Sequence, residues 1–342
     1  MDKHCRIGKS SLRFPDGPRI IAHSSLAGKK EGEGPLGPLF DRIYEDATLG
    51  EDSWEKAEST LQQEAAKLAL KKAGLSSEQI RYLFGGDLLG QIIATSFGVE
   101  ELNIPVFGLY GACSVCGEAL SLAAMTVAAG YAERAMAVTS SHFASAEKQF
   151  RFPLGYGNQR PLSATWTVTG AGAFIVAPKG GAVKISGITT GKVVDFGVKD
   201  SMNMGACMAP AACDTICQHL KDFGRQPKDY DRIFTGDLGL VGQKILIKLL
   251  RDEGIDLASV HDDCGIEMFD SDTQDTHAGG SGAGCSAAVL SALILPKLQR
   301  GDWKRVLFVP TGALLSTVSF NEGQSVPGIA HGLVLEHCEE ET

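Results

Sequence analysis

The sequence predicts an α/β protein made of two similar halves, each with a parallel sheet covered by helices on both faces. Two observations lead to this prediction: short apolar strands alternate with helical segments, and one strand-and-helix unit occurs twice. Parallel strands need long crossover connections, which are usually helices, so the alternation favours a parallel sheet between helix layers. A chain of 342 residues is also too long for one simple core and suits a double domain.

The elements of the first half follow from local patterns. Residues 1–40 are rich in Gly, Lys and Pro, and we expect an extended arm or loop that adds little to the core. A helix is predicted over residues 54–73, where apolar residues recur at helical spacing between an N-cap, Ser53, and a terminator, Gly74. The later elements are a strand at 82–84, a strand just before Cys113, an Ala-rich buried helix at 118–129 and a buried strand at 135–138.

A repeat of one unit is the basis for predicting a duplication. Cys113 and Cys285 each stand at the head of an Ala-rich helix that is followed by a glycine, an arginine and a buried strand. The glycine and the arginine follow at matching intervals, within one residue: Gly130 and Arg134 in the first unit, Gly301 and Arg305 in the second. We therefore predict a duplication: two similar α/β halves, residues 1–180 and 181–342, each with a cysteine at the head of an Ala-rich helix. The alternative is a chance match, since Ala-rich helices are common.

Charge and hydropathy exclude several classes of protein. A net charge of -9 without a basic stripe disfavours nucleic-acid binding. The longest apolar stretch, 287–295, ends at Pro296 and is far shorter than the roughly 20 residues that span a bilayer. Residues 1–14 lack the apolar region of a signal peptide. We expect a soluble, intracellular protein, with any membrane association peripheral.

The nine cysteines are expected to be reduced thiols, because their number is odd and the chain is expected to be intracellular. Two pairs, Cys113 with Cys116 and Cys213 with Cys217, resemble metal-ligand pairs, but both lie in apolar, helical windows without nearby His. We expect no metal site and no cofactor. Most of these cysteines are expected to be small core residues.

Cys113 is the most informative residue, because it lies at an elbow between a strand and a buried helix. A helix N-terminus presents free N–H groups and a positive dipole end, which bias a thiol toward thiolate and can face an anionic ligand. The elbow suits either acyl transfer or anion binding. The Gly-rich run at 279–284 lacks the ending of a phosphate loop, and it is predicted to be a tight turn that brings a second helix N-terminus to the pocket.

A duplicated α/β chain with a cysteine elbow resembles the thiolase and ketosynthase superfamily, whose halves pack as a five-layered αβαβα block. Ala112-Cys113-Ser114, with Ala119-Leu120 further along the helix, is similar to the nucleophile elbow of that family. The chain departs from the pattern at Cys116, where the family usually has glycine.

A closer resemblance, over nearly the whole chain, is to the stage V sporulation protein AD family of spore proteins. It rests on an ordered set of stretches: 34–37, 86–89, 110–114, 139–142 and 146–153 in the first half, and 208–212, 235–238, 261–265, 278–282, 311–316 and 329–332 in the second. The resemblance implies binding of dipicolinic acid, with calcium as a companion, and a part in its uptake into the developing spore. The implied partners are membrane proteins of the same transport system, at the spore inner membrane, and a homodimer is left open.

The catalytic partners of the superfamily are missing. Initiating ketosynthases carry Pro-His-Gln-Ala-Asn where this chain has Thr-Gly-Asp-Leu-Gly at 235–239, and an anionic Asp237 cannot stabilise an oxyanion. The family's active-site Asn falls on the turn at 283–284, and the second thiolase cysteine on 311–314. His277 is weighed as a substitute base against an ordinary solvated loop histidine. We therefore expect a binding protein without enzymatic activity, with an acyl-CoA or acyl-carrier ketosynthase and a structural scaffold as alternatives.

Dipicolinate is a planar pyridine with two ionised carboxylates, so an acidic protein needs local cations to hold it. Lys148, Phe150 and Arg151, with Arg160 shortly after, are expected on one loop, where arginine can chelate a carboxylate and phenylalanine can stack on the ring. The alternative is a solvated charged loop. Lys192 is the next candidate cation.

Three further residues follow predicted strands. His142 lies at the carboxyl end of a strand, where parallel sheets gather ligands, although a satisfied loop histidine is an equal alternative. Asp87 and Asp237 offer hard oxygen ligands for calcium, or else cap the helices that follow them. Cys113 itself is expected to line the ligand pocket, with an inert core thiol as the alternative.

Overall fold

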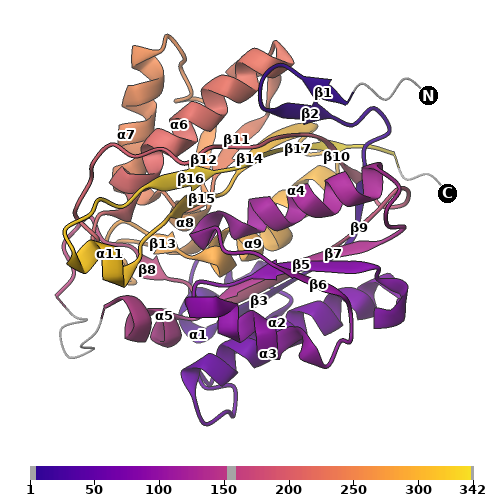
Figure 1. Cartoon of the computed structure of the whole chain (residues 1–342), viewed down its shortest axis with the longest axis horizontal. Coiled ribbons are helices and arrows are strands. Elements are labelled where there is room, and N and C mark those ends of the chain that lie inside the picture. Colours follow the sequence, from indigo (N-terminus) through magenta and orange to yellow (C-terminus); the bar gives the residue numbers. More distant parts are fainter. Residues whose placement is uncertain (1–4, 152–158, 340–342) are drawn as a thin grey trace.

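Ten strands lie side by side in one hydrogen-bonded path and form two groups of five. The computed structural model describes residues 5–151 and 159–339 (Figure 1). From the outer edge inward, the first group is β6 (Val106–Gly108), β5 (Tyr82–Gly86), β7 (Ala135–Ser141), β9 (Gly170–Ala177) and β3 (Arg19–Gly28). The second group, in the same order, is β12 (His261–Asp263), β11 (Arg232–Thr235), β14 (Arg305–Val309), β17 (Gly332–His337) and β10 (Val183–Thr189).

The two groups have the same pattern of strand directions. In each, the three outer strands pair in parallel, whereas β9 and β17 pair antiparallel with both of their neighbours. The prediction of a parallel sheet is therefore wrong for the inner strands. The parallel strands are those in which strand and helix alternate, whereas β9 is rich in glycine and alanine and gives no strand pattern. Gly172 is needed there, because a Cβ atom would lie 2.8 Å from the Ala287 side chain.

Helices and sheets form the five layers αβαβα (Figure 1). Helices α2 (Trp54–Ala73) and α3 (Ile93–Glu100) cover the outer face of the first group. Helices α6 (Met204–Phe223) and α7 (Gly239–Asp252) cover the outer face of the second, and α4 (Val115–Ala128) with α9 (Ala283–Val289) lie between the two groups. The predicted fold class is confirmed. The predicted boundary at 180 and 181 falls in the turn between β9 and β10, and the division into two domains stays a prediction.

The remaining elements are short. The strands among them are β1 (Arg6–Ile7), β2 (Ser11–Arg13), β4 (Arg42–Tyr44), β8 (Trp166–Thr167), β13 (Gly280–Ser281), β15 (Thr311–Ala313) and β16 (Gly328–Ala330). The α-helices are α1 (Lys29–Gly32), α5 (Phe143–Phe150), α8 (Cys264–Met268), α10 (Leu295–Gln299) and α11 (Thr317–Asn321). A π-helical segment, Leu290–Ile294, joins α9 to α10, and 3-10 turns at Gly90–Ile92 and Ala112–Ser114 precede α3 and α4.

Most elements predicted in the first half are present. Helix α2 begins after Ser53, whose side chain accepts a hydrogen bond from the Lys56 N–H, and ends at Gly74 in the left-handed conformation. Helix α4 begins earlier than predicted, at Val115. The repeated glycines, Gly130 and Gly301, both have positive φ angles, which explains why each unit needs glycine at that point.

The prediction of a loose arm over residues 1–40 is wrong for its central part. Residues 19–28 form β3, an inner strand in which Leu26 and Ala27 are fully buried. This strand pairs with β9 along its length and meets β10 at two residue pairs, so it joins the two groups of strands. The Gly- and Lys-rich stretch that suggested an arm, residues 28–34, begins at the last residue of β3 and forms the short helix α1 and the turn after it.

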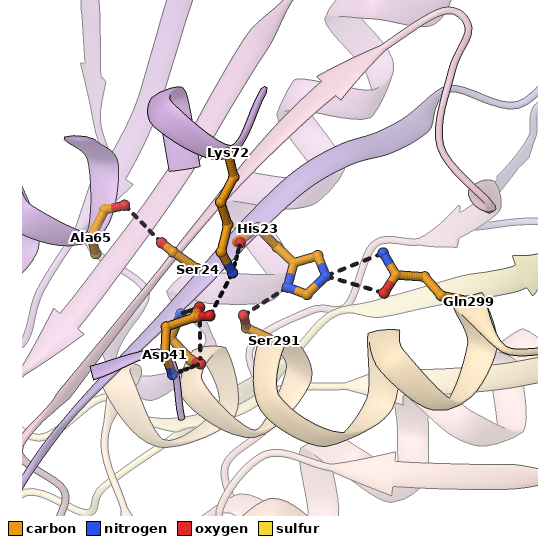
Figure 2. Close-up of polar contacts among 8 residues, drawn as sticks. His23, Ser24, Asp41, Ala65, Lys72, Ser291 and Gln299 are labelled. Carbon is orange, nitrogen blue, oxygen red and sulfur yellow. Dashed lines mark hydrogen bonds and ion pairs between the residues drawn. The ribbon is translucent and has the colours of Figure 1, made fainter. Parts of the chain in front are cut away.

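A polar network fixes β3 to helices of both halves (Figure 2). His23 Nδ1 lies 2.8 Å from Ser291 Oγ in the π-helical segment, and its Nε2 faces the Gln299 amide. On the other side Lys72 Nζ donates to the His23 carbonyl and to Asp41. Burial, assisted by the Lys72 ammonium, lowers the pKa of His23 to about 4, so the imidazole is a neutral structural bridge at physiological pH.

Candidate ligand-binding site

A cavity of about 480 Å³ opens at the elbow that carries Cys113. Its walls come from α5, the 3-10 turn before α3, the turn before α4, β13 and the segment from β15 to α11. Segments from both halves of the chain therefore meet at the cavity. A concave site of this size, with apolar walls and a few polar groups, is typical of sites for small ligands.

The elbow holds Cys113 in a fixed position. Ala112 has a φ angle of 50°, in the left-handed region that residues other than glycine rarely adopt, and this reverses the chain between β6 and α4. Gly312 of β15 packs directly on the turn, since a Cβ atom there would lie 2.5 Å from the Gly111 carbonyl oxygen. Cys113 is 6% exposed and lines the cavity, and its role in a ligand pocket stays a prediction.

Asp237 lies behind Cys113 and is fully buried. Its carboxylate accepts hydrogen bonds from Ser281 Oγ at 2.8 Å, the Gly282 N–H at 2.9 Å and Thr311 Oγ1 at 2.8 Å. The Cys113 sulfur lies 4.0 Å from the same Ser281 hydroxyl. The carboxylate thus sits in the second half of the chain, beside a thiol that belongs to the first.

Burial, and then the adjacent Asp237 carboxylate, raise the pKa of Cys113 well above its ordinary value. The expectation that the helix N-terminus biases this thiol toward thiolate is therefore wrong. Desolvation and a like charge outweigh the helix dipole, whose effect is modest and falls off within one turn. A raised pKa favours the thiol over the thiolate, and the thiol form is the poorer nucleophile.

The helix N-cap alternative for Asp237 is also wrong. The first N–H groups of α7 are bound by Asp263, which accepts from Leu238 at 2.9 Å and from Gly239 at 3.0 Å. Asp87 is not the N-cap residue of α3 either, since that position is Ile92, but its carboxylate accepts hydrogen bonds from the Leu89 N–H and from both the N–H and the hydroxyl of Thr95 in the first turn of α3. Each of these two carboxylates is already committed to donors of the protein, so neither fits a protein-built calcium site.

The segment around Phe150 is the helix α5, not the loop that we predicted. Its composition, Phe-Ala-Ser-Ala-Glu-Lys-Gln-Phe, favours a helix, and His142 provides the N-cap. Phe150 and Arg151 line the cavity together with Glu147. Lys148 points elsewhere: it is half exposed and pairs with Glu55 of α2 at 2.6 Å. Residues 152–158, which connect Arg151 toward Arg160, lie outside the described residues.

Glu147 forms an ion pair with the predicted ligand cation. Arg151 Nη1 lies 2.8 Å from Glu147 Oε1, within the cavity wall. Burial raises the pKa of Glu147, against the opposing effects of Arg151 and Arg160. Sequence analysis missed Glu147, although its position four residues before Arg151 is the spacing at which helical side chains of opposite charge meet. It also missed Tyr110 and Gln149, which line the same cavity.

The other candidate residues lie away from the Cys113 cavity. His142 is buried, accepts the Ala144 N–H at Nδ1 and donates from Nε2 to the Ala47 carbonyl, and burial lowers its pKa. It faces a separate hollow beside Trp54, as a satisfied histidine. Lys192 is 64% exposed and pairs with Asp214. His277 contacts the Pro161 carbonyl and Asp275.

Arg160 pairs with Asp275 at 2.9 Å and lies over the Trp166 ring, so it too is engaged outside the cavity wall. Within residues 5–151 and 159–339, three or more His, Cys, Asp or Glu side chains nowhere gather in a way that could hold a metal ion. In the same ranges no histidine lines the Cys113 cavity.

Comparisons with known proteins identify the family through sequence similarity and support the fold through structural similarity. The family model of stage V sporulation protein AD matches residues 8–336. Stage V sporulation protein AD of Bacillus subtilis is 44% identical over 331 residues, which cover 97% of this chain and 98% of that protein.

Solved structures of condensing enzymes share the fold. The 3-oxoacyl-[acyl-carrier-protein] synthase III of Aquifex aeolicus is 15% identical, with a TM-score of 0.56 over 94% of this chain and all of that one. A tetronic acid condensing enzyme is 17% identical, with a TM-score of 0.57 over 93% of this chain and 99% of that chain. At these identities the likeness concerns the fold alone.

Proposed function

The chain belongs to the stage V sporulation protein AD family, and from that membership and the chemistry of the cavity we propose that it binds dipicolinic acid without catalysing a reaction. The family places the protein in sporulation. We propose that binding serves the uptake of dipicolinate into the developing spore, either as the free dianion or as its calcium chelate. No cofactor is needed for this role.

The pairing of Cys113 with Asp237 is the observation that carries the proposal. Acyl transfer needs a thiolate, a base to move protons and donors for an oxyanion. Here the pKa of the thiol is raised by burial and by a buried carboxylate, and the described cavity wall contains no histidine. The turn that carries Cys113 has the geometry of a nucleophile elbow, but the raised pKa of the thiol favours a binding pocket over a catalytic site.

The cavity offers groups that suit a planar aromatic dicarboxylate. Arg151 can bind a carboxylate through two N–H groups, and Phe150 provides a ring face. Tyr110 and Gln149 add polar contacts in the same wall. Calcium is expected to arrive chelated by the ligand, because Asp87 and Asp237 already bind donors of the protein.

Calorimetric titration with dipicolinate, with and without calcium, beside a thioester-hydrolysis assay, tests the proposal. We expect saturable binding of one ligand per cavity and no turnover of acyl-CoA. Absence of dipicolinate binding in both calcium conditions, or acylation of Cys113 followed by turnover, contradicts it.

The second candidate is a ketosynthase-type acyltransferase with altered catalytic partners. The retained elbow and the shared fold of condensing enzymes favour it. It requires Cys113 to ionise, so mass spectrometry after incubation with acyl-CoA separates the two functions: a thioester on Cys113 supports the enzyme, and an unmodified thiol supports the binding protein.

We further propose a peripheral location at the spore inner membrane, where membrane proteins of the same transport system recruit the chain. In the part of the chain that the structure describes, every helix is too short or too polar to cross a bilayer. Fractionation of sporulating cells tests recruitment: membrane retention should be lost when the partner proteins are deleted. Retention that survives both the deletion and high salt would indicate a direct lipid anchor.

A homodimer is also proposed. Strand β6 is an edge strand whose Val106 and Phe107 side chains are 43% and 53% exposed, and such an edge is a template for pairing with a second chain. Sedimentation of the wild type and of Phe107→Lys tests this, with a dimer expected only for the wild type.

A further inference from the structure

The Cys113 cavity holds one buried ion pair, between Arg151 and Glu147. The two side chains are only 13% and 5% exposed, and their charged atoms lie 2.8 Å apart. Both line the cavity, and within the described residues Arg151 is the only cationic side chain that does so. The cavity therefore offers its cation to an anionic ligand only in competition with a carboxylate of the protein itself.

We propose that Glu147 takes up a proton from solvent when a dianionic ligand binds at Arg151, and that Glu147 thereby sets the pH range in which the cavity accepts a dianion. The inference rests on the proposed function, in which the dianion is dipicolinate. When Glu147 is ionised, the pair is neutral and a dianion adds two uncompensated charges. When Glu147 is protonated, Arg151 remains positive and faces the ligand alone. The proton is held on the Glu147 carboxyl group, and no other covalent bond changes.

The charged groups around Glu147 are engaged elsewhere, so Glu147 is the group expected to take up a proton when the ligand binds. On its own helix, Lys148 is paired with Glu55 of α2 on a different face. The other acid of α2 that contacts α5, Glu58, is fully buried and accepts hydrogen bonds from Ser140 and Ser145. Burial, and then the charge of Asp87, raise the pKa of Glu58 to about 8, but Glu58 does not line the cavity.

From the segment before β8, Arg160 attracts Glu147 but is itself paired with Asp275. From across the cavity the titratable groups are Tyr110 and Cys113, and burial raises the pKa of each, so both remain neutral at the pH of the experiment. Among these groups Glu147 is the one carboxyl group that lines the cavity, and burial raises its pKa.

Because proton uptake by Glu147 is coupled to ligand binding, the affinity for the ligand should depend on pH. Burial already raises the pKa of Glu147 in the free protein, and a bound dianion raises it further by adding negative charge. Binding then takes up a fraction of a proton, and the affinity falls as the pH rises, by up to about tenfold per pH unit between the two pKa values. Dipicolinate itself stays doubly ionised throughout a range from pH 6 upward, so the ligand does not supply this dependence.

The experiment is calorimetric titration of the full chain with dipicolinate between pH 6 and pH 8.5, in phosphate and in Tris. Because the two buffers differ in ionisation enthalpy, the difference in observed heat gives the number of protons taken up. Wild type is expected to take up a proton fraction and to lose affinity with rising pH. Glu147→Gln is expected to bind more tightly than wild type at pH 8.5, with a flat pH profile and no proton uptake.

Glu55→Gln is the matched control, since it makes the same chemical change in an ion pair outside the cavity. It should keep the wild-type profile, and circular dichroism should show both variants folded. If Glu147→Gln does not fold, proton counting on the wild type decides alone. Wild-type binding without proton uptake overturns this inference but leaves the proposed function intact, whereas absence of binding at every pH overturns both.

Discussion

The buried carboxylate of Asp237 adjoins the thiol of Cys113 and contributes, after burial itself, to raising the pKa of that thiol. The two residues come from different halves of the chain: Asp237 follows the carboxyl end of β11, and Cys113 lies in the turn before α4. In a catalytic elbow the neighbour of the thiol would draw off its proton. Here the neighbour helps to hold the proton in place.

Asp237→Asn should make Cys113 more reactive. Loss of an adjacent negative charge lowers the pKa of a thiol, so alkylation by iodoacetamide at pH 8 should become about tenfold faster or more. The measurement is the rate of modification of Cys113 by mass spectrometry, with Cys113→Ala to identify the site. An unchanged alkylation rate in a folded variant would show that burial alone protects the thiol.

Arg151→Ala should weaken dipicolinate binding by about 1.5 to 3 kcal/mol, the usual range for a hydrogen bond to a charged group. The fold should survive, because Arg151 lies at the C-cap of a short surface helix. Lys148→Ala is the control: it removes a cation from the same helix but outside the cavity, so calorimetry should show wild-type affinity. If Arg151→Ala binds normally, the carboxylate site belongs to another cation, and Lys192 would be examined next.

Glu31 contributes stability that should be lost as the pH rises from about 4.5 to about 7. Burial raises the pKa of Glu31 from 4.5 to about 7, so the native state keeps a proton that the unfolded chain releases. In that interval Glu31 binds more protons in the native state than in the unfolded chain, so its contribution to the free energy of unfolding decreases with pH. Burial, and then the charge of Asp87, also raise the pKa of Glu58, which acts in the same direction.

Glu31→Gln should remove this contribution, so that between pH 4.5 and pH 7 the unfolding temperature falls less, or rises more, with pH than in wild type, because an amide needs no proton to remain neutral and can still accept the Thr169 N–H. Glu33→Gln, a nearby exposed position, is the control and should keep the wild-type slope. Identical slopes in all three proteins would mean that Glu31 is ionised in the native state.

The elements that the sequence predicted are those with strong local signals. Helix α2 has both caps, Ser53 and Gly74, and the strands beside the repeated cysteines are continuously apolar. Strand β3 was missed because its residues gain their strand character from neighbours far along the chain. The loop predicted around Phe150 was wrong because charged residues were taken for a solvated loop, although their spacing also fits a helix.

The candidate site was predictable in part. Cys113 stands out in the sequence because it lies between a strand and a buried helix. Phe150 and Arg151 stand out because an aromatic ring and a guanidinium suit an aromatic dicarboxylate. All three residues line one cavity. His142, Lys148 and Lys192 were chosen by residue type and by their order along the chain. Neither property determines where a side chain points, and these three residues do not line the Cys113 cavity. The pairing of Glu147 with Arg151 follows from their helical spacing once this segment is known to be a helix. The contacts of Asp237 depend on tertiary packing, so only the structure reveals them.

The structure of the complex with dipicolinate, at saturating ligand, tests the central claim most directly. The account predicts the ligand in the cavity beside Cys113, with one carboxylate within hydrogen-bonding distance of Arg151 and the pyridine ring against Phe150. Ligand bound elsewhere, as in the hollow beside His142 and Trp54, or an empty cavity at saturating dipicolinate, would contradict it.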